Sequence, residues 1–512
     1  MGRNTLFGVG ERVFRMVVKL AMMGFIIDHV GKDGFGLWEI LVSVVGFMSL
    51  GVGGVGSAFQ KYVAEAYETR DFLRASRRLS NGAAMMLVLA LVMLVPLAIF
   101  PEWVAAVMRV SPQFQSTFLS AVVLLAATMV WTNFGTVYGS IVMGVHRIDL
   151  TRAVDLVCTL LEACLNVVLL LSGYGVLGLV ISYAVMEIAR TALYYTLARR
   201  IIPAIIVSPR MLSKSELRET MRFAGGYQVF NYLQVGYNSL LPIVIQRAFG
   251  EEVTGVYGIC RRLIGFPALI SEAVLLPLLS GATLVYARRE MERFRRLFFR
   301  VVKFTLVALV PGLVFLCVFS SATFTAMAKS PHELAPRSMI LLSVATVVGA
   351  LARVYAAMYR ATGGGSRDIM WTAGRMVTFV ATWAVVSASM GYFGALLAFV
   401  VAELAGWIYM DVAMAHVIGR GSLRKTCIEM GRVLAPAVVV GLVCAPVTWI
   451  GLPAGWEARW SAVVQLLLAA MVYGVIGGAG LVVSGFISSD EREWLGMYVP
   501  WLRKGSGSTV DG

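Results

Sequence analysis

Residues 31–38 read GKDGFGLW, and residues 250–257 read GEEVTGVY, at an offset of 219 positions. Each stretch has a glycine, any residue, an acid, two further residues, a second glycine, an aliphatic residue and an aromatic residue. Self-similarity at a fixed offset is typical of a chain built from two copies of one structural unit. The glycines suit a tight turn that needs a positive φ angle. The sequence therefore predicts two related halves, each with a sharp turn after its first helix.

Further matches keep the same order and nearly the same offset. The tripeptide RRL occurs at 77–79 and 295–297, and Gly-Tyr occurs at 173–174 and 391–392, both at an offset of 218. Six expected helices separate the copies, and an even number gives both halves the same orientation in a membrane. Halves related by an axis along the membrane normal can rock around a shared cavity, which is a recurring transporter design.

Composition places the chain in a membrane. Hydrophobic residues make up 59% of the chain and charged residues 14%, with a mean hydropathy of +0.79. Soluble domains contain about 45–50% apolar and about 25% charged residues. Apolar runs reach the roughly 20 residues that cross a bilayer as a helix, and no strand-length alternation recurs. We expect an all-α, polytopic fold of about fourteen transmembrane helices in two pseudo-symmetric six-helix lobes, plus two extra C-terminal helices. The expected helices are 10–30, 36–60, 82–101, 116–143, 154–172, 174–198, 223–249, 254–284, 301–324, 338–360, 370–390, 392–418, 433–451 and 460–486.

Basic residues are concentrated in the loops of one side. They cluster at 61–78, 199–222, 288–300 and 420–432, and the opposite loops hold few. By the positive-inside rule the basic side is cytoplasmic, so both termini are expected there, in a multi-pass protein of the cell inner membrane. The net charge of +15 is then a topology signal with anionic membrane lipids as partners, and it does not indicate nucleic acid. No cleavable signal is expected, because the basic N-terminus lacks a short apolar core with a cleavage site.

The lobe boundaries follow from the repeat. We expect an N-terminal six-helix lobe over 1–205, a C-terminal six-helix lobe over 206–420, and two additional helices with a cytoplasmic tail over 421–512. The connector that joins the lobes carries Pro203, Pro209 and many charges. The last two helices fall outside the repeat and are expected to be an appendix.

The segment 27–66 resembles the start of bacterial oligosaccharide flippases of the O-antigen type, the polysaccharide-transporter branch of the superfamily that also contains multidrug exporters. The resemblance is carried by the motif at 31–38, by the small-residue run LGVGGVGSA at 50–58, and by KYVAE at 61–65. It implies flipping of an undecaprenyl-diphosphate-linked oligosaccharide from the cytoplasmic to the outer leaflet, for surface polysaccharides such as lipopolysaccharide. It also implies polysaccharide polymerase or assembly proteins as partners.

Among the cations within the expected helices, four are candidates for substrate binding, namely Arg15 and Lys19 in the first expected helix, Arg261 in the eighth and Arg353 in the tenth. A charged residue at the bilayer centre costs about 2.5–3.5 kcal/mol on insertion scales, so such residues are candidates for function. These cations could bind a diphosphate. The alternative for those near helix ends is that the side chain reaches the membrane interface.

A stripe of amides follows the seventh expected helix. Gln228, Asn231, Gln234, Asn238 and Gln246 project within about a third of the helical circumference. A wall of amides offers donors and acceptors that suit a sugar. The alternative is that the amides form hydrogen bonds between packed helices.

Membrane carboxylates form a second group. Asp155 and Glu162 share one face of the fifth expected helix, and membrane acids often relay protons or bind Na⁺. They are the candidates for coupling to H⁺ or Na⁺. Glu187 and Glu403 occupy similar places in the two halves, which favours structural roles such as pairing with Arg190 or another cation.

Signatures of catalysis are missing from the sequence. No phosphate-binding loop with Lys-Ser/Thr occurs, the four histidines are dispersed, and the six cysteines lack metal-ligand spacing. We expect no enzyme activity, no cofactor and no metal.

Three functions remain open. The first is a lipid-linked oligosaccharide flippase, with a lipid-linked peptidoglycan precursor as a close variant. The second is a cation-coupled drug or metabolite antiporter of the same superfamily, although such a protein would favour acids and aromatic residues in its cavity. The third is a non-transporting membrane scaffold.

Overall fold

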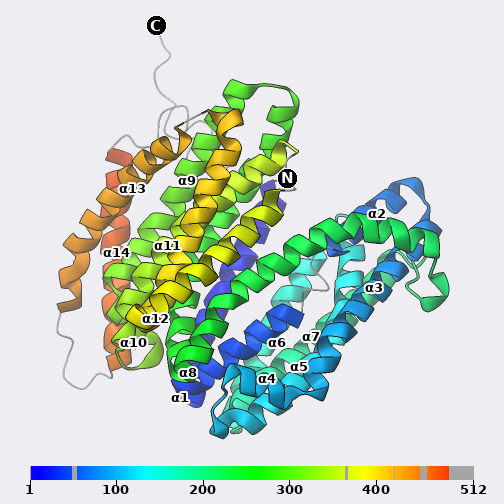
Figure 1. Cartoon of the computed structure of the whole chain (residues 1–512), viewed down its shortest axis with the longest axis horizontal. Coiled ribbons are helices and arrows are strands. Elements are labelled where there is room, and N and C mark those ends of the chain that lie inside the picture. The colour runs from blue at the N-terminus through cyan, green and yellow to red at the C-terminus, as the bar shows by residue number, and fades with distance from the viewer. Residues whose placement is uncertain (1, 49–54, 364–366, 420, 450–457, 484–512) are drawn as a thin grey trace.

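The computed structural model describes residues 2–48, 55–363, 367–419, 421–449 and 458–483, and these residues form helices and contain no strand (Figure 1). The elements are α1 (Gly2–Met48), α2 (Val55–Thr69), α3 (Phe72–Ile99), α4 (Pro101–Met108), α5 (Pro112–Gly144), α6 (Ile148–Leu171), α7 (Gly175–Ile201), η2 (Pro209–Met211), α8 (Lys214–Ala287), α9 (Met291–Val318), α10 (Ser320–Ala328), α11 (Leu334–Ala361), α12 (Arg367–Ile418), α13 (Ser422–Cys444), η3 (Ala445–Trp449) and α14 (Ala458–Val483).

Three of the long helices are broken by a glycine with a positive φ. The breaks lie at Gly31 (φ 71°, ψ 179°) in α1, Gly250 (φ 82°, ψ −174°) in α8 and Gly391 (φ 50°, ψ −130°) in α12. Glycine alone adopts such angles at little cost, because it has no Cβ. The sharp turn predicted at the two repeat glycines is confirmed. We expected short loops after these glycines, but helical structure resumes at once, so each long helix is two spans joined by a kink.

The chain forms a polytopic, all-α membrane fold. Within the described residues, eight helices are long and apolar enough to cross a membrane by length and composition. Large apolar side chains of α12, α13 and α14 are exposed, including Val385, Leu442 and Val475. Such residues fit contact with lipid chains, which are as apolar as the side chains themselves.

Two bundles make up the molecule (Figure 1). The first bundle consists of α2–α7 and the second part of α1 (32–48), and its apolar clusters are built from residues 37–207. The second bundle consists of α9–α14 and the second part of α8 (251–287), with a cluster over 282–437. The first parts of α1 and α8 lie where the bundles meet. The bundles converge near the α1–α8 junction and spread apart toward the end that carries the N-terminus.

The predicted lobe boundaries at 205/206 and 420/421 fall between helices, after α7 and after α12. The connector after α7 is tied to the first bundle by backbone N–H groups. Ile206 N donates to Ser76 Oγ at 3.0 Å, and Ser208 N donates to Ser80 Oγ at 3.1 Å. The start of α8 is therefore positioned against α3.

Candidate functional site

A cavity of about 450 Å³ lies in the first bundle, between α2, α5 and α7. Its walls carry glycines, hydroxyl groups, an amide and one oppositely charged pair. The lining residues are Gly56, Gln60, Thr132, Gly135, Thr136, Gly139, Ser140, Met143, Glu187, Arg190, Thr191 and Tyr194.

Glycines spaced by four residues let the helices around this cavity approach closely. A Cβ added to Gly135 would lie 2.5 Å from Thr191 Oγ1, and one added to Gly139 would lie 3.3 Å from the Tyr194 ring. Small residues allow membrane helices to pack backbone against backbone. The α5 stripe therefore fixes where the polar side chains of α7 lie.

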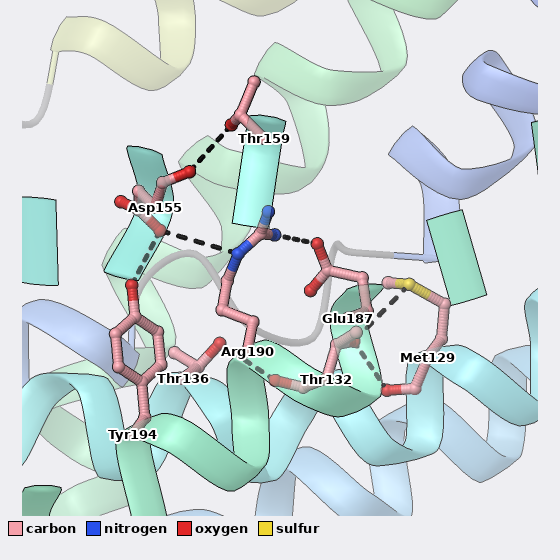
Figure 2. Close-up of polar contacts among 8 residues, drawn as sticks. All are labelled: Met129, Thr132, Thr136, Asp155, Thr159, Glu187, Arg190 and Tyr194. Atoms are coloured by element: carbon pink, nitrogen blue, oxygen red, sulfur yellow. Dashed lines mark hydrogen bonds and ion pairs between the residues drawn. The ribbon is translucent and has the colours of Figure 1, made fainter. Parts of the chain in front are cut away.

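One arginine organises the charges beside the cavity (Figure 2). The Arg190 guanidinium pairs with Glu187 on its own helix, and its Nε lies 3.5 Å from Asp155 Oδ1 on α6. The Tyr194 hydroxyl donates to Asp155 Oδ1 at 2.7 Å. The three charged side chains are 14–24% exposed. A cation between two carboxylates offsets much of the desolvation penalty that each would carry alone.

The cluster continues toward α1. Glu162, two turns along α6 from Asp155, interacts electrostatically with Lys19 of α1 and with Arg190. Lys19 is exposed and also lies in the field of Arg15. Three carboxylates and two cations thus face one another across α6, α7 and α1. We call Asp155, Glu162, Glu187, Arg190 and Lys19 the first-bundle cluster.

The second bundle holds a related but buried pair. Arg375 Nη1 donates to Glu403 Oε1 at 3.1 Å, and the two side chains are 2% and 5% exposed. Tyr237 donates to the same carboxylate oxygen at 2.9 Å, and Gln234 Oε1 accepts from Arg375 Nη2 at 3.1 Å. The guanidinium stacks 4.0 Å above the Trp371 ring. Both terminal nitrogens of Arg375 thus have hydrogen-bond acceptors, whereas its Nε is buried without one.

The order of acid and arginine along the chain is reversed between the two clusters. In the first bundle the acid on α6 meets an arginine on α7, whereas in the second the arginine on the first part of α12 (367–390) meets an acid on its second part (392–418). In both bundles a tyrosine hydroxyl donates to the carboxylate. Glu187 and Arg190 of the first-bundle cluster line a cavity. The pair of Arg375 and Glu403 is enclosed by the protein.

The predicted amide stripe does not form a single surface. Gln234 is bound to Arg375, and Gln246 is 1% exposed with no hydrogen-bond partner at either amide atom. Asn231 is half-buried, with its amide nitrogen unpartnered, and Asn238 is exposed. The side chain of Gln228 lies outside the described residues. The position of Gln234 matches the alternative of a hydrogen bond between helices.

The predicted membrane cations fall into separate environments. Lys19 belongs to the first-bundle cluster, and Arg15 lies close enough to Lys19 to affect it electrostatically. Arg353 lies beside the buried pair, because a Cβ added to Gly349 would meet both Arg353 Nη1 (3.3 Å) and Glu403 Oε2 (2.8 Å). Arg261 is exposed and donates to the backbone oxygen of Asn238 at 3.4 Å. These four cations therefore do not form one site.

Several residues of both clusters were not predicted as site residues from the sequence. Arg190 was considered only as a partner of Glu187, and Arg375 and Tyr194 were not considered. The cavity on α5 did carry a signal, since Thr132, Thr136 and Ser140 recur at steps of four. Such a stripe of small residues also fits plain helix packing, and only the positions of α2 and α7 reveal a cavity.

Residues 31–328 match the family described as polysaccharide biosynthesis protein, which covers more than half of the chain. The chain belongs to this family. No curated protein matches the sequence closely enough to count as a relative.

The fold is shared with transporters of the MOP superfamily. The lipid II flippase MurJ in an inward closed conformation aligns with a TM-score of 0.67 at 13% identity, over 93% of this chain and 98% of that chain. A multidrug resistance MATE family transporter aligns in its inward-facing conformation with a TM-score of 0.65 at 16% identity, over 80% of this chain and 96% of that chain. An outward-facing conformation of a MATE family transporter gives 0.55 at 16% identity, over 81% and 95%.

Proposed function

We propose that this protein flips an undecaprenyl-diphosphate-linked oligosaccharide from the cytoplasmic to the outer leaflet by alternating access, for surface polysaccharide biosynthesis. The observation that carries the proposal is the hydroxyl-lined cavity of the first bundle, with the cations Lys19 and Arg190 at its side. Membership of a polysaccharide biosynthesis family supports the same conclusion. The protein acts here as a transporter and not as an enzyme.

The cavity walls suit a glycan. Thr132, Thr136, Ser140 and Thr191 offer hydroxyl groups that both donate and accept. Gly135 and Gly139 bring Thr191 and Tyr194 of α7 close to α5, so the polar groups of the two helices line one cavity. A pocket of this size lies within the range of roughly 300–1,000 Å³ that ligand sites have. Part of a short oligosaccharide therefore fits between α2 and α7.

The diphosphate has a partner on α1. Lys19 is exposed, and Arg15 lies close enough to affect it electrostatically. Charge-assisted bonds to phosphate are roughly twice as strong as neutral ones. A diphosphate at α1 would also compete with Glu162 for Lys19. Glu162 would then keep only its weaker interaction with Arg190, and a bound H⁺ or Na⁺ would neutralise it, which links substrate binding to a coupling ion.

The orientation follows from the positive-inside rule. The basic loops and the N-terminus would face the cytoplasm, in the cell inner membrane with both termini inside. The end where α1 and α8 converge would face outward. The structure then corresponds to a state that is closed on the outer side. Polysaccharide polymerase or assembly proteins would receive the flipped substrate.

A second candidate is a cation-coupled antiporter of drugs or metabolites. It is favoured by the excess of carboxylates over cations in the first-bundle cluster, which would suit a cationic substrate. The exposed Lys19 argues against it, because it would repel such a substrate from the same entrance.

Complementation tests the proposed function. A strain that lacks its oligosaccharide flippase would receive this chain together with the enzymes that make the matching glycan, and surface polymer and membrane protein level would be scored together. Restored polymer supports the flippase. A normal protein level without polymer, combined with increased resistance to cationic dyes, would support the antiporter instead.

A further inference from the structure

The two halves cross closely at the end opposite the N-terminus. A Cβ added to Gly36 would lie 1.9 Å from the backbone oxygen of Glu251, and one added to Gly255 would lie 2.2 Å from the backbone oxygen of Lys32. Both Gly36 and Gly255, and both Lys32 and Glu251, are related by the repeat offset of 219. Each half therefore presents a glycine to the backbone of the other, and α1 and α8 touch at the pseudo-symmetry axis.

Side-chain hydrogen bonds at repeat-related positions also link the two halves. Lys32 Nζ donates to Ser330 Oγ at 3.1 Å, between α1 and the loop after α10. Ser111 donates from its N and its Oγ to the Glu251 carboxylate, at 2.7 Å each, between the loop before α5 and α8. Ser111 and Ser330 are also 219 positions apart. The same link is thus made twice, once through a lysine and once through a glutamate. We call these contacts the outer closure.

Helix α14 adds a link that has no place in the repeat. Arg459, at the start of α14, has a side chain that is 14% exposed. Its guanidinium donates to both carboxylate oxygens of Asp28 on α1 and to the backbone oxygen of Gly24 at 3.3 Å. It also donates to the backbone oxygens of Ala326 (3.1 Å) and Met327 (2.7 Å) on α10. One arginine therefore holds α1 and α10 together.

Arg247, the position in the second half that corresponds to Asp28, has fewer bonds to its surroundings. Arg247 stands 219 positions after Asp28, and its backbone oxygen accepts one bond, from Arg109 Nη1 at 3.4 Å. Asp28 receives Arg459 and also Lys329 Nζ at 3.3 Å. The glycine and serine contacts of the outer closure therefore occur in both halves. The additional ion pairs with Arg459 and Lys329 are made by Asp28 on α1.

We propose that α14 is a working part of the outer gate, in which Arg459 is a positioning residue that sets how long this end stays closed. The proposal rests on the alternating access of the proposed function. α14 packs with α10 in the second bundle, so its bonds to Ala326 and Met327 persist when the bundles separate. Opening must break the bonds to Asp28 and Gly24. A guanidinium suits a link that joins two helices. Its planar fork donates two hydrogen bonds to the Asp28 carboxylate, and its remaining N–H groups donate to backbone carbonyl oxygens.

Spin-label distances across the closure test the role of Arg459. Labels would be attached to cysteines at Gln113 and Glu333, which are exposed and lie at the starts of α5 and α11, in a chain whose six native cysteines are replaced. The protein would be placed in liposomes of bacterial lipid without any glycan. We expect Arg459→Ala to raise the ratio of the separated to the closed population about tenfold or more, since bonds to charged groups contribute about 1.5–3 kcal/mol.

Three further variants make the result decisive. Arg432→Ala on α13 removes an exposed arginine that pairs with Glu429 on its own helix, and it should leave the distances as in the parent. Arg459→Lys should give an intermediate ratio, because an ammonium cannot reproduce the fork. Asp28→Asn weakens only the α1 side and serves where Arg459→Ala does not accumulate. A parental distance distribution in Arg459→Ala, or in Asp28→Asn where that variant replaces it, would overturn the proposal.

The experiment separates the gate from the substrate. Distances are measured without a glycan, so a shift in Arg459→Ala supports the gate even if complementation by the parent chain fails. Conversely, a complementing chain with unshifted distances retains the proposed function and loses the role of α14.

Discussion

The hydroxyl of Tyr194 on α7 donates a hydrogen bond to Oδ1 of Asp155 on α6 at 2.7 Å, beside the cavity of the first bundle. Tyr237 makes the matching bond to Glu403 in the second bundle at 2.9 Å. A tyrosine thus holds a carboxylate in each half, next to an arginine. The first arrangement borders a cavity and the second is enclosed, so we assign substrate and ion chemistry to the first bundle and rigidity to the second.

Replacing Arg190 tests the centre of the first-bundle cluster. In Arg190→Ala, Asp155 and Glu187 would lose their shared cation, and two largely desolvated carboxylates would be left to repel each other. We expect a lower thermal unfolding temperature of the purified protein and no export. Arg147→Ala is the matched control, because it removes an exposed arginine whose partner Asp149 is also exposed. Equal unfolding temperatures for the two variants would contradict the described cluster.

Lys19 should act on the substrate and not on the fold. Lys19→Ala is expected to reduce surface polymer about tenfold or more at near-normal protein level, since a bond to a charged phosphate contributes about 1.5–3 kcal/mol. Lys19→Arg should retain partial activity because the charge remains. Lys425→Ala, an exposed lysine on α13, is the control. Full activity of Lys19→Ala would remove the anionic substrate and favour the antiporter.

The enclosed pair of the second bundle predicts the opposite pattern. Arg375→Ala and Glu403→Ala should each lower the membrane protein level, because each leaves an unpaired buried charge. The double variant Arg375→Met/Glu403→Leu should recover much of that level, since apolar residues of similar volume often replace a buried pair without loss. Quantitative immunoblotting of membranes measures this. A double variant as poor as the single ones would indicate that the charges themselves are required.

The glycine crossing should tolerate no side chain. Gly36→Ala places a Cβ where the Glu251 backbone oxygen lies, 1.9 Å away, and overpacking of this kind costs typically 1–3 kcal/mol or more. We expect loss of export together with reduced thermal stability. Gly265→Ala, in α8 with nothing within 4 Å of the added Cβ, should be neutral. Wild-type behaviour of Gly36→Ala would refute the close crossing of α1 and α8.

The sequence was a good guide where one residue type answers one geometric need. Gly31 and Gly250 were predicted as turn positions, because only glycine adopts their φ angles cheaply, and they are the kinks of α1 and α8. The same repeat predicted paired halves of one orientation. It did not reveal that Lys32 and Glu251 make equivalent links to Ser330 and Ser111, since their charges differ in sign.

The site was harder to predict, because its residues come together only through helix packing. Asp155 and Glu162 were chosen from one helical face, and Lys19 as a deep cation, but nothing in the sequence placed them together. Gln234 was predicted to line a wall of amides and Arg353 to bind a diphosphate, whereas the structure places both beside the pair of Arg375 and Glu403. Which face of a membrane helix meets a cavity depends on its rotation against its neighbours, and an apolar background gives that rotation little signal.

Reconstituted flipping tests the central claim most directly. The purified chain would be placed in liposomes that hold a polyprenyl-diphosphate oligosaccharide in both leaflets, and an external, membrane-impermeant glycosidase would report the accessible fraction. We predict cleavage of nearly all the lipid with the parent chain, and of only about half with Lys19→Ala, because lipid in the inner leaflet stays protected without flipping. Cleavage that stops at the outer-leaflet half with the parent chain, in liposomes where a cationic dye is transported, would contradict the account.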